Sequence, residues 1–172
     1  MPFGWDTGER RLDSGGFESR QRVLVPEAIV ESSESGARWL GTAYWFTVGR
    51  VSRGGVRTRW RGDRPSLSLF GGLTLLVFGP PQLELSEDVV SCRYTIEGGL
   101  LASRAGGSVT LAQGRAEDGF ELSVVVEEYL PRLAARAGAP RWTGALYAKC
   151  QRPFHAAVSR RYFDLLASEA VA

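Results

Sequence analysis

The sequence predicts a mainly β protein: a single antiparallel barrel or a strongly curved sheet of about eight strands, followed by a C-terminal α-helix. Residues 56–61 and 120–128 alternate apolar and polar side chains, which is the period of a half-buried strand. Glycine pairs and an Asp-Gly turn punctuate the chain at short intervals, as in sheets built from hairpins. Helical spacing is clear only after Pro153, so no helix crosses between strands and a parallel sheet is disfavoured.

Size and composition agree with one domain. The chain has 172 residues, of which 44% are hydrophobic and 23% charged, enough for a single core. The 21 basic and 19 acidic residues give a net charge of +2, which is too balanced for binding nucleic acid through charge alone. The two cysteines, Cys92 and Cys150, exclude a disulfide framework. No membrane span and no leader are recognisable, so a cytoplasmic protein is expected.

Residues 1–20 are predicted to form a flexible N-terminal arm or lid, and residues 21–172 a single β-rich domain. Four glycines lie among charged and serine residues in the first segment, without any period. Trp5 is unusual for a solvated tail, so its ring is a candidate for covering a groove on the body.

The predicted strands follow in chain order. Pro26 restricts 23–30 to an edge or broken strand. Residues 38–53 are rich in Trp, Tyr, Phe, Val and Thr, a strand composition, and Gly54-Gly55 would turn the chain into the strand 56–61. Further strands are predicted at 67–69, 73–78, 83–85, 90–97, 109–111 and 120–130.

The predicted C-terminal helix spans about 153–169. Pro153 suits the first helical position, and Phe154, Val158, Tyr162 and Leu165 then form an apolar stripe. Residues 141–151 fit either a strand or a first helix.

Glu128 is the sharpest candidate for acid–base chemistry. It continues the apolar alternation of Leu122, Val124 and Val126, which places its carboxylate on the core side of the predicted strand. Burial raises the pKa of a carboxyl group and suits it to proton transfer. A strand end open to solvent, or an ion pair with an arginine, is the structural alternative for the same residue.

Aromatic side chains supply the other candidates. Tyr44, Phe46, Trp60 and Tyr94 project from predicted strands, where large rings either fill a barrel or line a pocket. The two tyrosine hydroxyls would donate hydrogen bonds to a ligand, and the other two rings would form its wall. His155, in the first turn of the predicted helix, is a candidate because histidine titrates near neutral pH. The sequence leaves a filled and a hollow interior equally open.

Common catalytic and metal-binding motifs are absent. The chain has no phosphate-binding loop and no nucleophile elbow, and its single histidine excludes a multi-histidine zinc site, so no cofactor or metal is expected. Arg57, Arg59 and Arg61 form a ladder on the face opposite Trp60, which fits a solvated sheet face better than an RNA site. No nucleic-acid partner is therefore expected.

The order of eight or so antiparallel strands before a C-terminal helix, over residues 22–168, resembles the calycin architecture of the lipocalin-like barrels. It is also similar to the START-like, Bet v 1-type helix-grip fold, in which a curved sheet wraps a long C-terminal helix. The lipocalin Gly-x-Trp signature is not present, because Gly36 and Trp39 are spaced too widely. The helix-grip fold implies two short helices after its first strand, and residues 31–36 are too few to hold them. Both resemblances imply carriers and enzymes of apolar small molecules.

These observations predict a cofactor-free enzyme of cyclase or isomerase type that acts on an apolar or polycyclic small molecule in a dry cavity. Glu128 would be the acid or base, and Trp5 would lie on the lid. The alternatives are a non-catalytic carrier of the same ligand class and a protein-interaction module. A hollow interior with Glu128 turned inward favours the enzyme, a hollow interior without ionisable groups favours the carrier, and a filled interior favours the interaction module. Ligand identity and oligomeric state are not set by the sequence.

Overall fold

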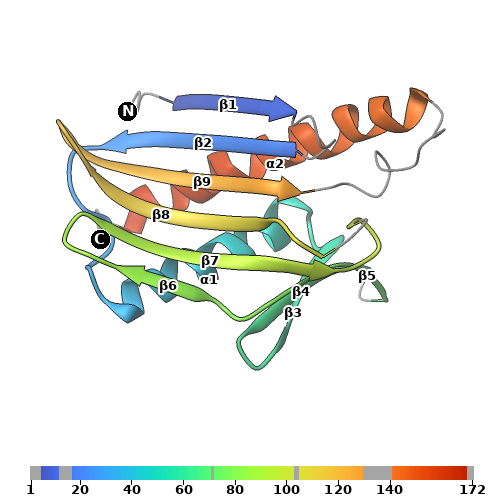
Figure 1. Cartoon of the computed structure of the whole chain (residues 1–172), viewed down its shortest axis with the longest axis horizontal. Coiled ribbons are helices and arrows are strands. Elements are labelled where there is room, and N and C mark those ends of the chain that lie inside the picture. Colours follow the sequence, from blue (N-terminus) through green and yellow to red (C-terminus); the bar gives the residue numbers. More distant parts are fainter. Residues whose placement is uncertain (1–4, 12–16, 71, 103–104, 130–140, 170–172) are drawn as a thin grey trace.

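The computed structural model describes residues 5–11, 17–70, 72–102, 105–129 and 141–169, which form an open sheet with two helices on one face (Figure 1). In chain order the elements are β1 (Trp5–Arg11), β2 (Phe17–Val25), α1 (Glu34–Val51), β3 (Val56–Arg61), β4 (Arg64–Leu69), β5 (Leu73–Phe78), β6 (Gln82–Leu85), β7 (Val89–Gly98), β8 (Ser108–Ala116), β9 (Gly119–Tyr129) and α2 (Arg141–Glu169).

The sheet is antiparallel, and its nine described strands follow the order β1-β2-β9-β8-β7-β5-β4-β3, with β6 also paired to β7. β1 and β3 lie at the two ends of this order, so the described strands form a curved sheet and not a closed barrel (Figure 1). The predicted fold class is confirmed in its second form, a strongly curved sheet with a C-terminal helix.

The hairpin strands were predictable because their turn residues are explicit. β3 and β5 have the predicted bounds, and Glu117–Asp118 forms the turn between β8 and β9. Gly119 has a φ of 129°, and a Cβ on it would collide with the carbonyl oxygen of Val25. Only glycine fits this conformation and this close approach, so the Asp-Gly pair fixes the register of β9.

The predicted strand 38–53 is wrong, because residues 38–51 belong to the helix α1 and Ser52 caps its end. Ser33 caps the helix by accepting a hydrogen bond from the backbone N–H of Gly36 at 3.1 Å. The buried side chains of the helix recur at intervals of three and four residues, at Ala37, Leu40, Tyr44 and Val48. Their spacing is that of one helix face, and burial of this face outweighs the strand-like composition.

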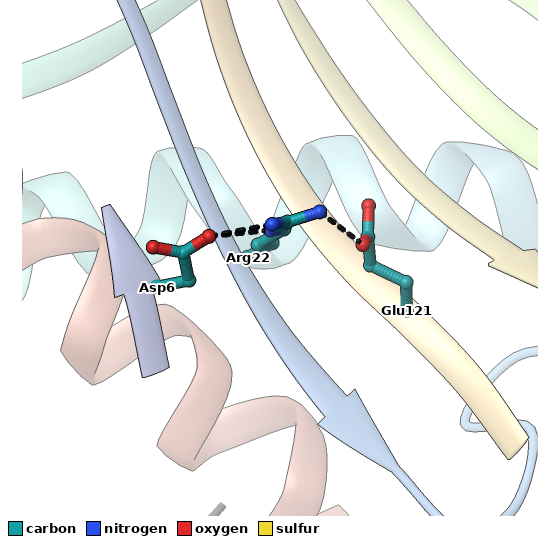
Figure 2. Close-up of polar contacts among 3 residues, drawn as sticks. All are labelled: Asp6, Arg22 and Glu121. Atoms are coloured by element: carbon teal, nitrogen blue, oxygen red, sulfur yellow. Dashed lines mark hydrogen bonds and ion pairs between the residues drawn. The ribbon is translucent and has the colours of Figure 1, made fainter. Parts of the chain in front are cut away.

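The described part of the segment predicted as an N-terminal arm or lid is paired into the sheet. Residues 5–11 form the edge strand β1, and residues 17–20 begin β2. Figure 2 shows Arg22 of β2 between two carboxylates, with nitrogen–oxygen distances of 2.6 Å to Asp6 of β1 and 3.3 Å to Glu121 of β9. Backbone pairing holds β1 in the sheet, with a smaller contribution from the Arg22–Asp6 ion pair, and neither leaves a hydrophobic period in the sequence.

The C-terminal helix is confirmed, but it begins at Arg141, and Pro153 lies inside it and not at its first position. Proline lacks an N–H, so it leaves one helical hydrogen bond unmade and strains the turn before it. The apolar stripe that follows, with Val158, Tyr162 and Leu166 all at most 1% exposed, binds the helix to the rest of the core. Packing of this stripe keeps the helix continuous through the proline.

A buried glutamine fixes the segment that leads from β2 into α1. The Gln113 side chain on β8 accepts hydrogen bonds from the backbone N–H groups of Ile29 (2.6 Å) and Val30 (3.0 Å). Its amide nitrogen donates to the carbonyl oxygen of Val30 at 2.8 Å. Buried backbone groups need hydrogen-bond partners, and here the Gln113 side chain supplies those that a neighbouring strand would otherwise give. It thereby fixes the backbone just before α1.

Candidate functional site

An aromatic cluster lies between the sheet and the two helices. At its centre is Trp45 of α1, which is 2% exposed. Its ring centroid lies 4.7 Å from Phe78 of β5 and 5.2 Å from both Tyr94 of β7 and Tyr44 of α1. Such tilted and edge-to-face pairs each add about 0.5–1.5 kcal/mol beyond the burial of their apolar area. Trp45 therefore joins α1 to two strands of the sheet.

Tyr162 extends the cluster to α2. Its ring packs edge-on against Tyr44 with the centroids 5.6 Å apart, and its hydroxyl donates to the carbonyl oxygen of Leu40 at 3.1 Å. The Leu40 carbonyl is buried. Without the Tyr162 hydroxyl it would therefore have one hydrogen-bond partner fewer. The contact sets how closely α2 approaches α1.

A cavity of about 40 Å³ lies beside this cluster, between both helices and the sheet. One water molecule occupies about 30 Å³ in the liquid, whereas ligand pockets commonly measure about 300–1,000 Å³, so the cavity as it stands is nearly filled. Two of the lining side chains, a tyrosine and a histidine, carry polar titratable groups, and the others are aliphatic or aromatic. The lining residues are Tyr44, Trp45, Val48, Leu67, Leu76, Phe78, Ile96, Val109, Val126, Phe154, His155 and Val158.

Both titratable groups on the cavity wall are uncharged at neutral pH. Burial lowers the pKa of His155 to about 4, because the apolar wall does not solvate an imidazolium ion. Burial raises the pKa of the Tyr44 hydroxyl for the same reason, since a phenolate would be poorly solvated there. The neutral imidazole can donate one hydrogen bond and accept another, and the phenol can do the same. The site is thus apolar with hydrogen-bonding capacity and no formal charge.

Tyr94 lies behind Trp45 and does not line this cavity. Burial is the main cause that raises the pKa of its hydroxyl, followed by the neighbouring Cys92. A Cβ on Gly41 of α1 would lie 2.5 Å from the Tyr94 hydroxyl and 3.0 Å from the Cys92 sulfur. Gly41 therefore lets α1 approach β7 closely, and Tyr94 supports the wall that Trp45 presents.

Glu128 falls on β9, but its side chain lies outside the described residues. Val126, two residues earlier on the same strand, lines the cavity. The pairing of β2 with β9 changes register between Ser19, opposite Val126, and Phe17, opposite Tyr129, so the alternation is interrupted at this point. The catalytic role of Glu128 remains a prediction.

Phe46 and Trp60 lie together, but away from the cavity. Phe46 projects outward from α1 and is 56% exposed, and Trp60 on the edge strand β3 is 47% exposed. Both line a surface groove of about 420 Å³ between α1 and β3, named here the Phe46–Trp60 groove. Its lining residues are Thr42, Trp45, Phe46, Gly49, Gly54, Val56, Arg57, Thr58 and Trp60.

Trp5 anchors β1 to α2. Its ring meets Phe163 of α2 edge-on, with the centroids 5.4 Å apart, and the guanidinium of Arg160 lies 5.8 Å from the Trp5 ring centroid. It lines an open groove of about 730 Å³ along α2 and does not line the cavity. Of the residues predicted from the sequence, the structure brings Tyr44 and His155 together at the cavity.

The sequence did not predict the aliphatic and aromatic wall of the cavity, above all Trp45, Phe78 and Phe154. One signal was available, because Ala37, Leu40, Gly41, Tyr44, Trp45 and Val48 are spaced by three, one, three, one and three residues. This spacing belongs to one face of a helix and would have turned Trp45 inward and Phe46 outward.

The described part of the chain offers neither a metal-binding cluster nor a helix that could cross a membrane. No three His, Cys, Asp or Glu side chains there lie close enough together to hold a metal ion. Neither described helix combines the length and the apolar character that crossing a membrane requires.

Comparisons with known proteins give little similarity. No protein-family model and no curated protein matches the chain. The crystal structure of CalU16 from Micromonospora echinospora aligns over 100% of both chains, with 12% sequence identity and a TM-score of 0.35. A match at this level assigns neither fold family nor activity.

Proposed function

We propose that the chain binds a small apolar molecule at the cavity between α1, α2 and the sheet. The observation that carries the proposal is the composition of the wall. Both helices and the strands β4, β5, β7, β8 and β9 contribute to it, and its two titratable side chains, Tyr44 and His155, are neutral at pH 7. An apolar wall with few polar groups is the usual character of a small-molecule site.

With a volume of about 40 Å³, the proposed site requires that the described state is a closed one. A ligand with several heavy atoms needs more room, and a movement of α2 would supply it. Pro153 leaves a helical hydrogen bond unmade directly before Phe154 and His155, which line the cavity. The segment 153–158 of α2 is therefore the lid of the proposed site, in place of the N-terminal arm expected from the sequence.

The topology supports a ligand site at this position. The first strand after the edge strand, β2, pairs with the last strand, β9, and the C-terminal helix lies on the face that the sheet curves around (Figure 1). This agrees with the helix-grip resemblance more closely than with a closed barrel, although the single helix α1 stands where that fold has two short ones. Carriers and enzymes of apolar small molecules are what this resemblance implies.

Binding without catalysis is the form of the proposal that the chemistry of the wall favours. A general base is most effective when its pKa lies near the working pH. A pKa of about 4 makes His155 a weak base at pH 7, so it is better suited to hydrogen bonding than to proton abstraction. A cyclase or isomerase activity would rest on Glu128, the acid–base candidate from the sequence.

Calorimetric titration with indole tests the proposal, because indole is a small apolar probe with a single N–H donor. We expect saturable binding with a dissociation constant on the order of 10⁻⁴ M. Val158→Phe and Leu76→Phe each place a larger side chain in the cavity and should abolish that binding.

The matched control is Phe46→Ala, which alters an exposed ring outside the cavity and should leave indole binding unchanged. Urea unfolding of each variant shows that it is folded. Indole binding that survives both cavity-filling substitutions, or that is lost in Phe46→Ala, would contradict the proposed site. Native mass spectrometry of protein purified without added ligand would then show which molecule, if any, it carries.

A further inference from the structure

We propose that the edge strand β3 and the Phe46–Trp60 groove form a docking surface for an extended acidic segment of a partner protein, which adds to the sheet as a further strand. This surface is separate from the cavity and independent of the function proposed for it. Three observations carry the inference: an open sheet edge, an exposed aromatic groove beside it, and arginines on and around that edge.

The sheet edge is open at two residues of β3. β3 pairs only with β4 among the described strands. The backbone N–H of Phe70 donates to the carbonyl of Gly55 at 2.8 Å, and this sets the phase of the antiparallel ladder. In this ladder every second residue of β3 bonds to β4 through its backbone, and these residues are Arg57, Arg59 and Arg61. The residues between them direct their backbone N–H and C=O groups away from the sheet.

Val56 is the first of these alternate residues, and its outward groups are already satisfied. Its N–H donates to the hydroxyl oxygen of Ser52, and that hydroxyl donates to its carbonyl, both at 3.0 Å. The outward backbone groups of Thr58 and Trp60 have no hydrogen-bond partner among the described residues, so they are the open positions. Unpaired groups on an edge strand are a template for another chain.

The groove lies beside these same residues. The side chains of Thr58 and Trp60 line it together with Phe46, and its volume of about 420 Å³ has room for one or two apolar side chains. Single exposed apolar residues are ordinary, but two exposed aromatic rings that share one groove are typical of an interaction site. Aromatic residues also contribute most to binding energy at protein interfaces.

Arginines lie in the groove, beside it and on the opposite face of β3. The guanidinium of Arg50 lies 5.5 Å from the centroid of the Phe46 ring, Arg57 lines the groove, and Arg61 is exposed at the end of β3. None of the residues that line the groove is acidic. A strand added beside β3 places every second side chain on the arginine face and the others on the groove face. The complementary segment therefore alternates acidic and apolar residues.

A second copy of the chain is a poorer occupant. An antiparallel pair of two β3 strands would bring the arginines at 57, 59 and 61 of one copy opposite those of the other. Like charges directly opposite each other destabilise a strand pair. An acidic partner removes this repulsion and gains attraction instead.

Fluorescence anisotropy with labelled synthetic peptides tests the proposal. The probe is acetyl-EVEFEVE-amide, in which acidic and apolar residues alternate. Its controls are KVKFKVK, with the charges reversed, EEEVVFE, with the alternation broken, and the probe with N-methyl groups on alternate backbone nitrogens. We expect saturable binding of the probe alone, weaker in 0.5 M NaCl because exposed charges are screened.

Paired variants of the protein locate the binding. Trp60→Ala should weaken it by roughly tenfold or more, whereas Trp39→Ala, an equally large change at a partly exposed residue outside the groove, should not. Arg61→Glu should weaken it and Arg20→Glu, on another strand, should not. Circular dichroism confirms that each variant is folded. Equal binding of the charge-reversed or N-methylated peptides, loss of binding in Trp39→Ala alone, or a concentration-dependent dimer in sedimentation would overturn the proposal.

Discussion

Trp45 and Phe46 are neighbours in the sequence of α1, yet one is 2% exposed and the other 56%. Trp45 contacts three aromatic rings and lines both the cavity and the Phe46–Trp60 groove, whereas Phe46 contacts the guanidinium of Arg50 and lines the groove but not the cavity. The same residue class thus has two different surroundings one position apart. The inner face of α1 holds the protein together, and the outer face is available to other molecules.

This difference follows from the helical period and not from composition. A rotation of about 100° per residue moves a side chain from the core to the rim, and burial of the inner ring alone stabilises the fold. An exposed ring gains little from burial in the folded chain. Substitutions on the two faces should therefore separate stability from binding.

The largest effect is expected from Trp45→Ala compared with Phe46→Ala. Removing the buried ring should lower the free energy of unfolding by about 3–5 kcal/mol, because it leaves a cavity among three rings. Removing the exposed ring should change it by no more than about 0.5 kcal/mol. Urea unfolding followed by circular dichroism measures both, and equal losses would end the distinction between the two faces.

Two glycines of α1 sharpen the comparison. Gly41→Ala should destabilise by about 1–3 kcal/mol, because the new methyl group would meet the Tyr94 hydroxyl and the Cys92 sulfur in a packed layer. Gly49→Ala should be neutral or stabilising by up to about 1 kcal/mol, because its nearest atom would be 4.0 Å away and alanine favours helix. Thermal unfolding of both variants checks the signs, and a stabilising Gly41→Ala would show that α1 does not approach β7 so closely.

The sheet was largely predictable because strands and tight turns leave local signals. The alternation at 56–61 and the Asp-Gly turn at 118–119 both specify their elements without help from distant residues. The helix α1 was missed because its many aromatic and β-branched residues favour strand when composition is weighed before spacing. β1 was missed because an edge strand held by backbone pairing and ion pairs needs no apolar period.

The candidate site was less predictable than the fold. Tyr44 and His155 were both named from the sequence, yet the reason that they share a cavity is the contact between α1 and α2, which no local pattern contains. Phe46 and Trp60 were expected on one wall, and they do share a groove, but on the outside of the molecule. Assigning Phe46 to a strand placed it on the wrong side of the core.

The pH dependence of stability gives a smaller effect. Burial lowers the pKa of His155 in the folded state to about 4, below the ordinary 6.5, so the unfolded chain takes up the proton first. The contribution of the neutral His155 ring to the free energy of unfolding is complete above pH 6.5. It is lost as the pH falls towards 4. Between pH 7 and pH 5 wild type should lose about 1–2 kcal/mol more than His155→Phe. Denaturant unfolding at the two pH values measures this, and identical losses in the two proteins would show that the ring is solvated.

The smallest effect is expected from the exposed ion pairs in Figure 2. Arg22→Gln removes the contacts with Asp6 and Glu121 on the outer face of the sheet. Exposed pairs contribute little and are screened by salt. The melting temperature should fall slightly in low salt and match wild type in 0.5 M NaCl, whereas a large loss that persists in high salt would mean that β1 depends on Arg22 for its place in the sheet.

Methyl NMR during a titration with indole tests the central claim most directly, because it compares the interior with the surface in one sample. The methyl signals of Val48, Val109, Val126 and Val158, which line the cavity, should shift and saturate together. Those of Val56, in the Phe46–Trp60 groove, and Leu85, exposed on β6, should stay in place. Saturating shifts confined to Val56, or no saturating shift at the four cavity valines, would contradict a ligand site between the helices and the sheet.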